Sequence, residues 1–195
     1  EYISDPAKPV PYTNGVYARR NNEYMAEDQR FAASRPDVLV FETEALTEDI
    51  TLAGSILADL HVSITGTDAD FIVKLVDVLP ENTPNLKNAP RGFQMAGMQQ
   101  LVRAEVMRGK FRNSFEKPEA FEPGKITRVR LSLNDVAHSF KKGHKIMVQI
   151  QSSWFPLADR NPQKFVNIYT CDDSDFQKAT IRIYDDSKII LPVLK

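Results

Sequence analysis

The sequence predicts an all-β protein, built as a two-sheet antiparallel jelly-roll sandwich with an irregular N-terminal arm. From Val38 onward, apolar residues recur at every second position, which is the period of strands with one buried face. Turn residues separate about eight such runs, a pattern typical of sandwiches and jelly rolls. No amphipathic helix longer than about three turns follows residue 36. With 195 residues, 42% of them hydrophobic, the chain is long enough for one such core.

Residues 1–36 are predicted to form the arm, an interdomain linker that lies on a surface, and residues 37–195 the sandwich domain. The arm is interrupted by residues that break regular structure, namely Pro6, Pro9, Pro11 and the pair Asn14-Gly15. Its polar second half, from Arg19 to Arg30, offers Tyr24 and Met25 as anchors and accommodates a short helix between Glu23 and Phe31.

The predicted strands differ in how regular their patterns are. Clear alternation predicts half-buried strands at Ile56–Ile64, Thr127–Leu133 and Ile146–Ile150. The segment Phe71–Leu79 is apolar on both faces apart from Lys74 and Asp77, which is typical of a central strand covered on both sides. Further strands are predicted at Val38–Glu42, Leu101–Arg108, Ala179–Tyr184 and Lys188–Leu194.

Composition excludes several functions. The net charge of −1, from 25 basic and 26 acidic residues, gives no support for nucleic-acid binding. No apolar run approaches the roughly 18 residues of a membrane span. The single cysteine, Cys171, cannot form an internal disulfide. The chain opens Glu1-Tyr2-Ile3 without a basic leader region, so we expect it to be the inner part of a longer polypeptide.

No catalytic nucleophile is predicted. A serine hydrolase needs a serine poised against a base, often in the turn Gly-x-Ser-x-Gly, and that motif is absent. Ser152 and Ser153 follow a strand, but no glycine permits the strained turn. We interpret them as strand-end hydroxyls that bond the backbone.

The histidines and acidic loops admit a metal site or a structural role. His138 and His144 flank a turn and, with Asp135, are candidates for a metal site or an acid–base pair. The favoured interpretation has both imidazoles bonding backbone carbonyls across the turn. The acidic stretches Asp68–Asp70 and Asp172–Asp175 offer oxygen ligands for Ca²⁺, but neither matches a known calcium loop, so they are interpreted as solvated turns. We therefore predict no metal and no cofactor.

Two further residues are assigned no chemistry. His61 alternates outward on a strand, where a surface or interdomain contact is expected. Cys171 precedes Asp172 and Asp173, whose carboxylates disfavour a thiolate, so it is interpreted as a bystander.

The loop Trp154-Phe155-Pro156 carries two large aromatic side chains that are costly to leave in water. It serves either to stack on a sugar or another ligand, or to pack under the loop or against a neighbouring domain. We favour packing, because aromatic residues commonly dominate interface cores. Arg160 beside it is suited to pairing with a carboxylate.

At several positions the sequence resembles the C-terminal β-sandwich domain of the X-Pro dipeptidyl-peptidase and cocaine esterase hydrolases. The resemblance is greatest to α-amino acid ester hydrolases and glutaryl-7-aminocephalosporanic acid acylase-like enzymes. The stretches that carry it are Tyr24–Ala32, Arg35–Phe41, Gly66–Phe71, Arg108–Arg112, Asp135–His138, Gly143–Ile146 and Arg160–Pro162. Together they extend over nearly the whole chain.

The resemblance implies a galactose-binding-domain-like jelly roll at the end of a serine hydrolase that acts on amino-acid esters, acyl amides or X-Pro peptides. Such enzymes hold their Ser-Asp-His triad in an α/β-hydrolase domain, and no residue here matches a triad member. The expected partner is that missing domain, a homo-oligomer is left open, and a periplasmic or secreted location is favoured over the cytoplasm.

The accessory domain is expected to cover the catalytic domain and to help shape its substrate cleft or an oligomer. The candidate contact residues come from the arm and from the Trp154 loop: Tyr24, Asp28, Arg30, Phe31, Trp154, Phe155, Asp159, Arg160 and Asn161. The alternatives are a carbohydrate-binding module using Trp154 and neighbouring aromatics, and a pure oligomerisation module.

Overall fold

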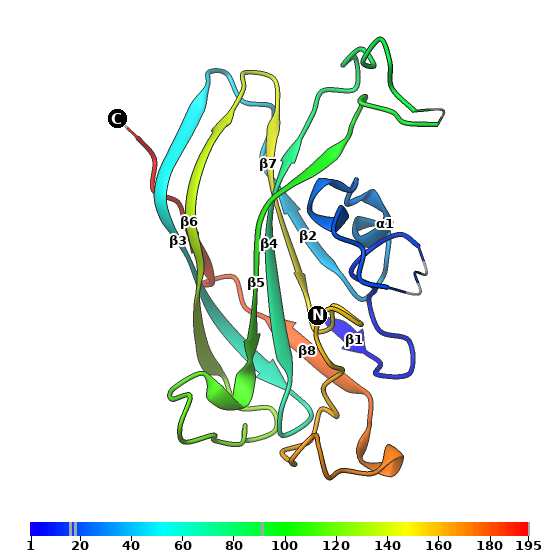
Figure 1. The fold of residues 1–195 in the computed structure, drawn as a ribbon. Coiled ribbons are helices and arrows are strands. Elements are labelled where there is room, and N and C mark those ends of the chain that lie inside the picture. The colour runs from blue at the N-terminus through cyan, green and yellow to red at the C-terminus, as the bar shows by residue number, and fades with distance from the viewer. Residues whose placement is uncertain (16, 18, 91, 195) are drawn as a thin grey trace.

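Two antiparallel sheets face each other in the computed structural model, which describes residues 1–195 except residues 16, 18, 91 and 195. The first sheet has the order β1 (Tyr2–Ser4), β8 (Ala179–Ile183), β3 (Ile50–Ile64) and β6 (Thr127–Phe140), and β9 (Lys188–Ile190) also pairs with β3. The second has the order β2 (Leu39–Glu42), β7 (Lys145–Gln151), β4 (Asp70–Val78) and β5 (Gln99–Arg108). The predicted antiparallel sandwich is therefore confirmed (Figure 1).

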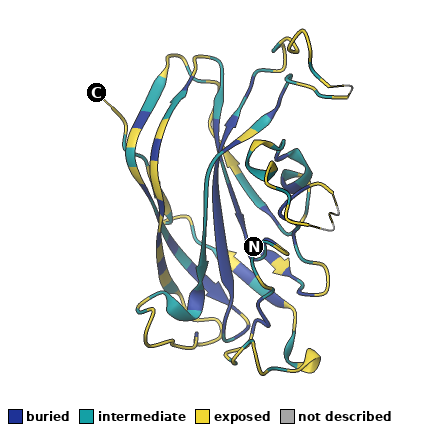
Figure 2. Cartoon of the chain, in the orientation of Figure 1, coloured by how far each residue is buried: buried dark blue, intermediate teal, exposed yellow. Residues whose placement is uncertain are grey.

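The predicted central strand is correct, since every residue of β4 except the last is buried. The dark-blue strand crosses the middle of Figure 2. On its inner side Phe71, Val73 and Leu75 join the main core, and on its outer side Ile72 and Val76 join a second apolar cluster beneath the arm.

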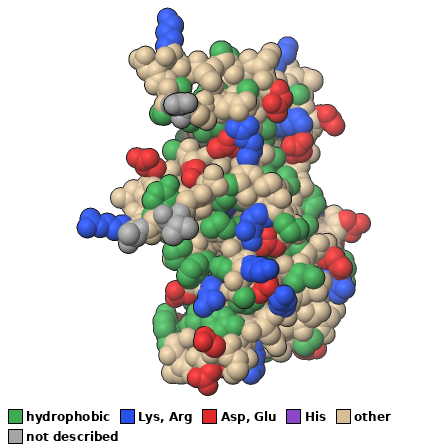
Figure 3. Space-filling model, turned by 90° about the vertical axis from the view of Figure 1, so that its right-hand side faces the viewer, with side chains coloured by type: hydrophobic (Ala, Val, Ile, Leu, Met, Phe, Trp, Pro, Cys, Tyr) green, Lys and Arg blue, Asp and Glu red, His purple; other side chains and the backbone are tan. Residues whose placement is uncertain are grey.

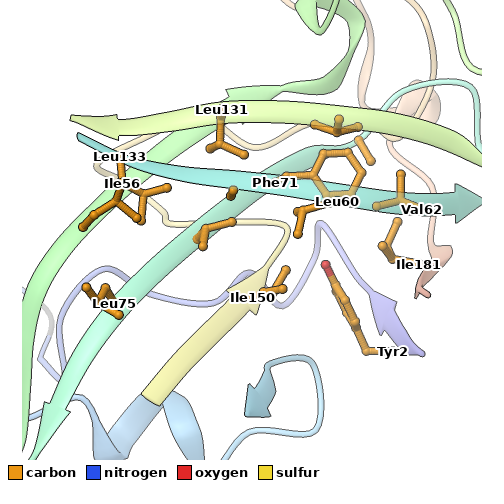
Figure 4. Packing of buried hydrophobic residues seen from close by; sticks show 14 of the residues in the cluster. Tyr2, Ile56, Leu60, Val62, Phe71, Leu75, Leu131, Leu133, Ile150 and Ile181 are labelled. Atoms are coloured by element: carbon orange, nitrogen blue, oxygen red, sulfur yellow. The ribbon is translucent and has the colours of Figure 1, made fainter. Parts of the chain in front are cut away.

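The main core fills the space between the sheets. Side chains from β3, β4, β6 and β7 meet there, among them Leu60, Phe71, Leu131 and Ile150 (Figure 4). Each such side chain contributes roughly 1.5–3 kcal/mol through burial. Tyr2 closes one end of this core and is 3% exposed.

Two strands are longer than predicted, because irregularities interrupt their alternation. The pairing of β3 with β6 shifts register between Ser55 and Leu57, next to Gly54 with its φ of 127°. The extra residue lies in β6, where Asn134 has a φ of 64°, so the buried positions of β6 change from Val129, Leu131 and Leu133 to Val136 and Phe140. In β3 the phase is kept, since Leu52 and Ile56 both face the core, and only Gly54 and Ser55 interrupt the apolar pattern.

The arm is more integrated into the sandwich than expected. Its first residues form β1, which pairs with β8, and Val10 and Tyr12 are 1% and 4% exposed. The predicted short helix is present as two pieces, a 3-10 turn η1 (Tyr24–Ala26) and α1 (Arg30–Ala33). Both lie on the outer face of the second sheet (Figure 1). The division of the chain at residue 36 stays a prediction.

Two more 3-10 turns occupy the loops at one end of the sandwich, η2 (Gly109–Phe111) and η3 (Asp173–Asp175). Among the residues the structure describes, no helix has the length and apolar character needed to cross a bilayer.

Candidate functional site

Trp154 lies beneath the arm rather than on the surface. Its side chain is 5% exposed, and its ring packs edge-on against Tyr24 with centroids 5.6 Å apart. Tyr24 in turn contacts Tyr12 at 5.5 Å. The packing interpretation of Trp154 agrees with this geometry. The carbohydrate-binding alternative loses its main residue, because a buried indole cannot stack on a sugar.

A second group of contacts ties the arm to β5. Arg30 and Asp28 form an ion pair of 2.5 Å, and Asp28 also accepts a hydrogen bond from the backbone N–H of Gln99 at 3.2 Å. Arg30 donates to the carbonyl of Ala96 at 3.2 Å. Phe31 packs with the small apolar cluster around Ala32. Asp28 and Arg30, which were predicted to contact another domain, therefore attach the arm to the sheet within this chain.

Phe155 and Arg160 form the exposed part of this region. Phe155 is 38% exposed. Its backbone N–H donates to the carbonyl of Val10, and its carbonyl accepts the N–H of Tyr12, each at 3.0 Å. The Arg160 guanidinium lies 5.6 Å from the Phe155 ring and donates to the carbonyl of Pro6 at 3.0 Å. A hollow of about 330 Å³ begins at Pro156, the residue after Phe155, and is lined by Tyr12, Tyr17, Arg19, Arg20, Pro156 and Leu157.

Asp159 and Asn161 both contact a buried ion cluster. The cluster consists of Asp68, Asp70, Arg108, Lys110 and Asn161. The carbonyl of Asp159 accepts from Arg108 at 3.0 Å. Asn161 is 3% exposed, and its side-chain amide donates to the Asp70 carboxylate at 2.7 Å. Arg108 donates two hydrogen bonds of 3.1 Å to the same carboxylate. Asn161 therefore offers almost no side-chain surface to another domain.

The prediction that Asp68–Asp70 forms a solvated turn is wrong. Asp68 and Asp70 are each 1% exposed, because Arg108 and Lys110 compensate their charge. Burial, and then the nearby Asp70 carboxylate, raise the pKa of Asp68 to about 6. The other acidic stretch, Asp172–Asp175, caps η3 and pairs with Lys164.

His138 and His144 share one carboxylate instead of bonding backbone carbonyls as predicted. His138 Nε2 lies 2.9 Å from one oxygen of Asp77, and His144 Nδ1 lies 2.8 Å from the other. Asp77 is 3% exposed and belongs to β4, whereas His138 belongs to β6. Asp135 is not part of this group. Among the described residues, no set of three histidines, cysteines or acids is arranged to hold a metal ion.

The serines are structural. Ser152 and the hydroxyl of Tyr2 share a buried hydrogen bond of 2.6 Å, and Ser153 accepts the N–H of Val10 at 2.8 Å. His61 pairs with Asp186 at a surface turn, and the Cys171 thiol donates to the carbonyl of Ile168 at 3.3 Å. In the described part of the chain, none of these serines or Cys171 is bonded to a histidine.

Comparison with known proteins identifies the domain. Residues 14–189 match the family described as the X-Pro dipeptidyl-peptidase C-terminal non-catalytic domain. The chain belongs to this family. It is 34% identical over 198 residues to cocaine esterase of Rhodococcus sp. (strain MB1 Bresler), with 100% of the chain and 32% of the esterase aligned.

Two solved structures resemble this X-Pro dipeptidyl-peptidase C-terminal domain along its length. An aminopeptidase from the marine sediment archaeon Thaumarchaeota archaeon has a TM-score of 0.91 and 41% identity, covering 100% of this chain and 33% of its own. An α-amino acid ester hydrolase has a TM-score of 0.90 and 41% identity, covering 99% and 32%. The chain thus spans about a third of the length of these relatives.

In this member of the family, the residues that sequence reasoning missed are the buried partners of recognised motifs. Arg108 and Asp70 belong to two of the resembling stretches, yet nothing in either stretch signals that they meet. Asp77 and Lys74 break the apolar pattern of β4, and that interruption is the signal that marks them. A charged residue in a strand covered on both sides must find a partner or lose its charge.

Proposed function

We propose that this chain is the accessory domain of a serine hydrolase acting on amino-acid esters, acyl amides or X-Pro peptides. It covers the α/β-hydrolase domain and completes one wall of the substrate cleft. The observation that carries the proposal is the match of the whole chain to about a third of each hydrolase relative, in a family described as non-catalytic.

The variety of the relatives supports a shared architectural task. Proteins named cocaine esterase, aminopeptidase and α-amino acid ester hydrolase all contain this domain at 34–41% identity. Because those names denote different substrates, the choice of reaction rests mainly with the remainder of the enzyme. The accessory domain then supplies a surface for the catalytic domain to pack against, and no side chain that reacts with the substrate.

The surface that fits this task is the arm face. Tyr17 is 53% and Phe155 38% exposed, and both lie close to the hollow beside Arg19 and Pro156. Figure 3 views the molecule from the side that carries the arm, where apolar, basic and acidic side chains are interspersed. Mixed polarity of this kind is typical of interfaces between domains of one chain. Trp154 supports the surface from below.

The experiment uses the full-length enzyme. The double variant Tyr17→Ala/Phe155→Ala should lower kcat/KM about tenfold, as expected for the loss of about 1.4 kcal/mol of positioning energy. It should also separate the unfolding of the two domains into distinct calorimetric transitions.

Phe115→Ala is the matched control, since Phe115 is 80% exposed in the loop between β5 and β6. It should change neither property. An unaltered kcat/KM with one unaltered transition in the double variant would contradict the proposed docking face.

A further inference from the structure

Lys74 is a fully buried lysine that faces the arm. It lies at the centre of β4, opposite Ala104 of β5 and Gln149 of β7, and is 0% exposed. Its ammonium nitrogen donates to Oε1 of Gln29, on the arm, at 3.1 Å. The same nitrogen lies 5.8 Å from the centre of the Phe31 ring and 5.5 Å from that of Trp154.

Within the described part of the chain, no acidic side chain is in contact with Lys74, and Glu27 acts on it only from a distance. On the arm, the Glu27 carboxylate is bonded by Thr13 and the N–H of Asn14, while Asp28 and Arg30 pair with each other. The facing residues of β5 and β7 and the Trp154 loop present uncharged side chains: Ala104, Val106, Met147, Gln149, Gln151 and Trp154. An ammonium group carries three donors, and one acceptor is in reach.

A buried charge that is not paired destabilises the packed state far more than a neutral amine does. The layer between the arm and the sheet therefore favours the uncharged form of Lys74.

We propose that Lys74 is a proton-controlled latch for the arm: the arm closes over the neutral amine, and protonation favours its release from the sheet. The latch follows from contacts within this chain and does not depend on docking to a catalytic domain.

The direction of the effect follows from linkage. Burial lowers the pKa of Lys74 from 10.5 to about 7, whereas release of the arm returns the amine to water. The open form therefore binds the proton more tightly, and the opening constant rises about tenfold for each pH unit between about 10 and 7 as the pH falls. Below about pH 7, Lys74 is charged whether the arm is closed or open, so the opening constant no longer changes with pH. The pKa of Asp68, about 6, lies below this window.

Amide hydrogen exchange on the 195-residue chain tests the latch. The N–H groups of Tyr12 and Gln29 bond the carbonyls of Phe155 at 3.0 Å and Gln99 at 2.9 Å, so both report release of the arm. After correction for intrinsic rates, their protection should fall about fiftyfold from pH 9 to pH 7. The N–H of Phe121, bonded to Thr67 at 2.9 Å, serves as the reference and should keep its protection.

Lys74→Met removes the titrating group and should make the protection of the arm high and independent of pH. Lys188→Met, at an exposed lysine of β9, should retain the wild-type pH dependence. Protection of Tyr12 and Gln29 that is independent of pH in the wild type, or a pH dependence that persists in Lys74→Met, would overturn the latch.

A second measurement needs no variant. Trp154 is the only tryptophan of the chain and lies beside the Lys74 nitrogen. Its fluorescence should change with a midpoint near pH 7, together with the ¹³Cε shift of one lysine. If every lysine ¹³Cε signal titrates above pH 9.5, the latch is refuted even when Lys74→Met does not fold.

Discussion

Gly66 lies where the backbone of one loop closely approaches that of another. A Cβ placed on Gly66 would lie 2.1 Å from the carbonyl oxygen of Gln163, far below any real contact. That oxygen also accepts the N–H of Thr67 at 3.1 Å, and Gln163 itself has a φ of 64°. Only glycine permits this approach.

Gly66→Ala should therefore destabilise the domain by about 1–3 kcal/mol, since a backbone atom must move to make room. Urea unfolding monitored by fluorescence measures the change. Gly124→Asn is the control, because Gly124 has a φ of 76° with nothing within 4 Å of its Cβ position and asparagine tolerates that conformation. Equal stability of Gly66→Ala and the wild type would show that the two loops separate easily.

The contacts of individual side chains were the least predictable part of the structure. Lys74 was recognised only as an interruption in an apolar strand, and its burial depends on Gln29, which lies 45 positions away. In the same way, the bond between Asn161 and Asp70 spans 91 positions. Local patterns carry no information about partners that the fold brings together, so only the motifs were foreseeable, and not their pairings.

Asp77 links three elements of the fold. It projects from β4 of one sheet to His138 on β6 of the other, and to His144, the residue just before β7. Because its two oxygens serve one imidazole each, a single side chain connects the sheets at this end of the sandwich.

Asp77→Ala leaves both imidazoles without their acceptor and should cost about 1–3 kcal/mol of unfolding free energy, measured by urea denaturation. Asp135→Ala provides the comparison, since Asp135 is exposed on the same strand as His138 and should change stability by less than about 0.5 kcal/mol. Similar losses in both variants would mean that Asp77 has no special role in joining the sheets.

Strands were predicted well where the pattern was regular: β4 from its continuous apolar run and β7 from its unbroken period of two. The errors lie where the backbone departs from a regular strand. The bulge at the left-handed Asn134 of β6 reverses the phase of that strand, and Gly54 and Ser55 interrupt the apolar pattern of β3, so both strands extend further than their patterns predict. The arm strand β1 was missed because three residues are too few to establish a period.

Over the whole molecule, the motifs that resemble hydrolases gather into three buried polar groups: the ion cluster at Asp70, the histidine pair at Asp77 and the layer beneath the arm. Each joins segments distant in sequence, and none places a hydroxyl or thiol against an imidazole in the described residues. The residues of these motifs therefore join distant segments of the fold and attach the arm to the second sheet.

The isolated 195-residue chain should accordingly hydrolyse neither p-nitrophenyl acetate nor an X-Pro p-nitroanilide above the buffer rate, and should not react with a fluorophosphonate probe. The full-length protein, assayed in parallel, is the positive control. Labelling of the isolated chain at Ser152 or Ser153 would contradict the assignment of both serines to structural hydrogen bonds.

The pairing of β1 with β8 has a consequence for biosynthesis. Tyr2–Ser4 pairs with Ala179–Ile183, so this strand cannot pair until a segment that lies 175 or more positions later in the chain has been translated. Contacts this remote in sequence are made slowly. Until translation passes Ile183, the nascent polypeptide keeps Tyr2 and the strand edge of Ile64 unpaired, which is the interval in which a chaperone would protect it best.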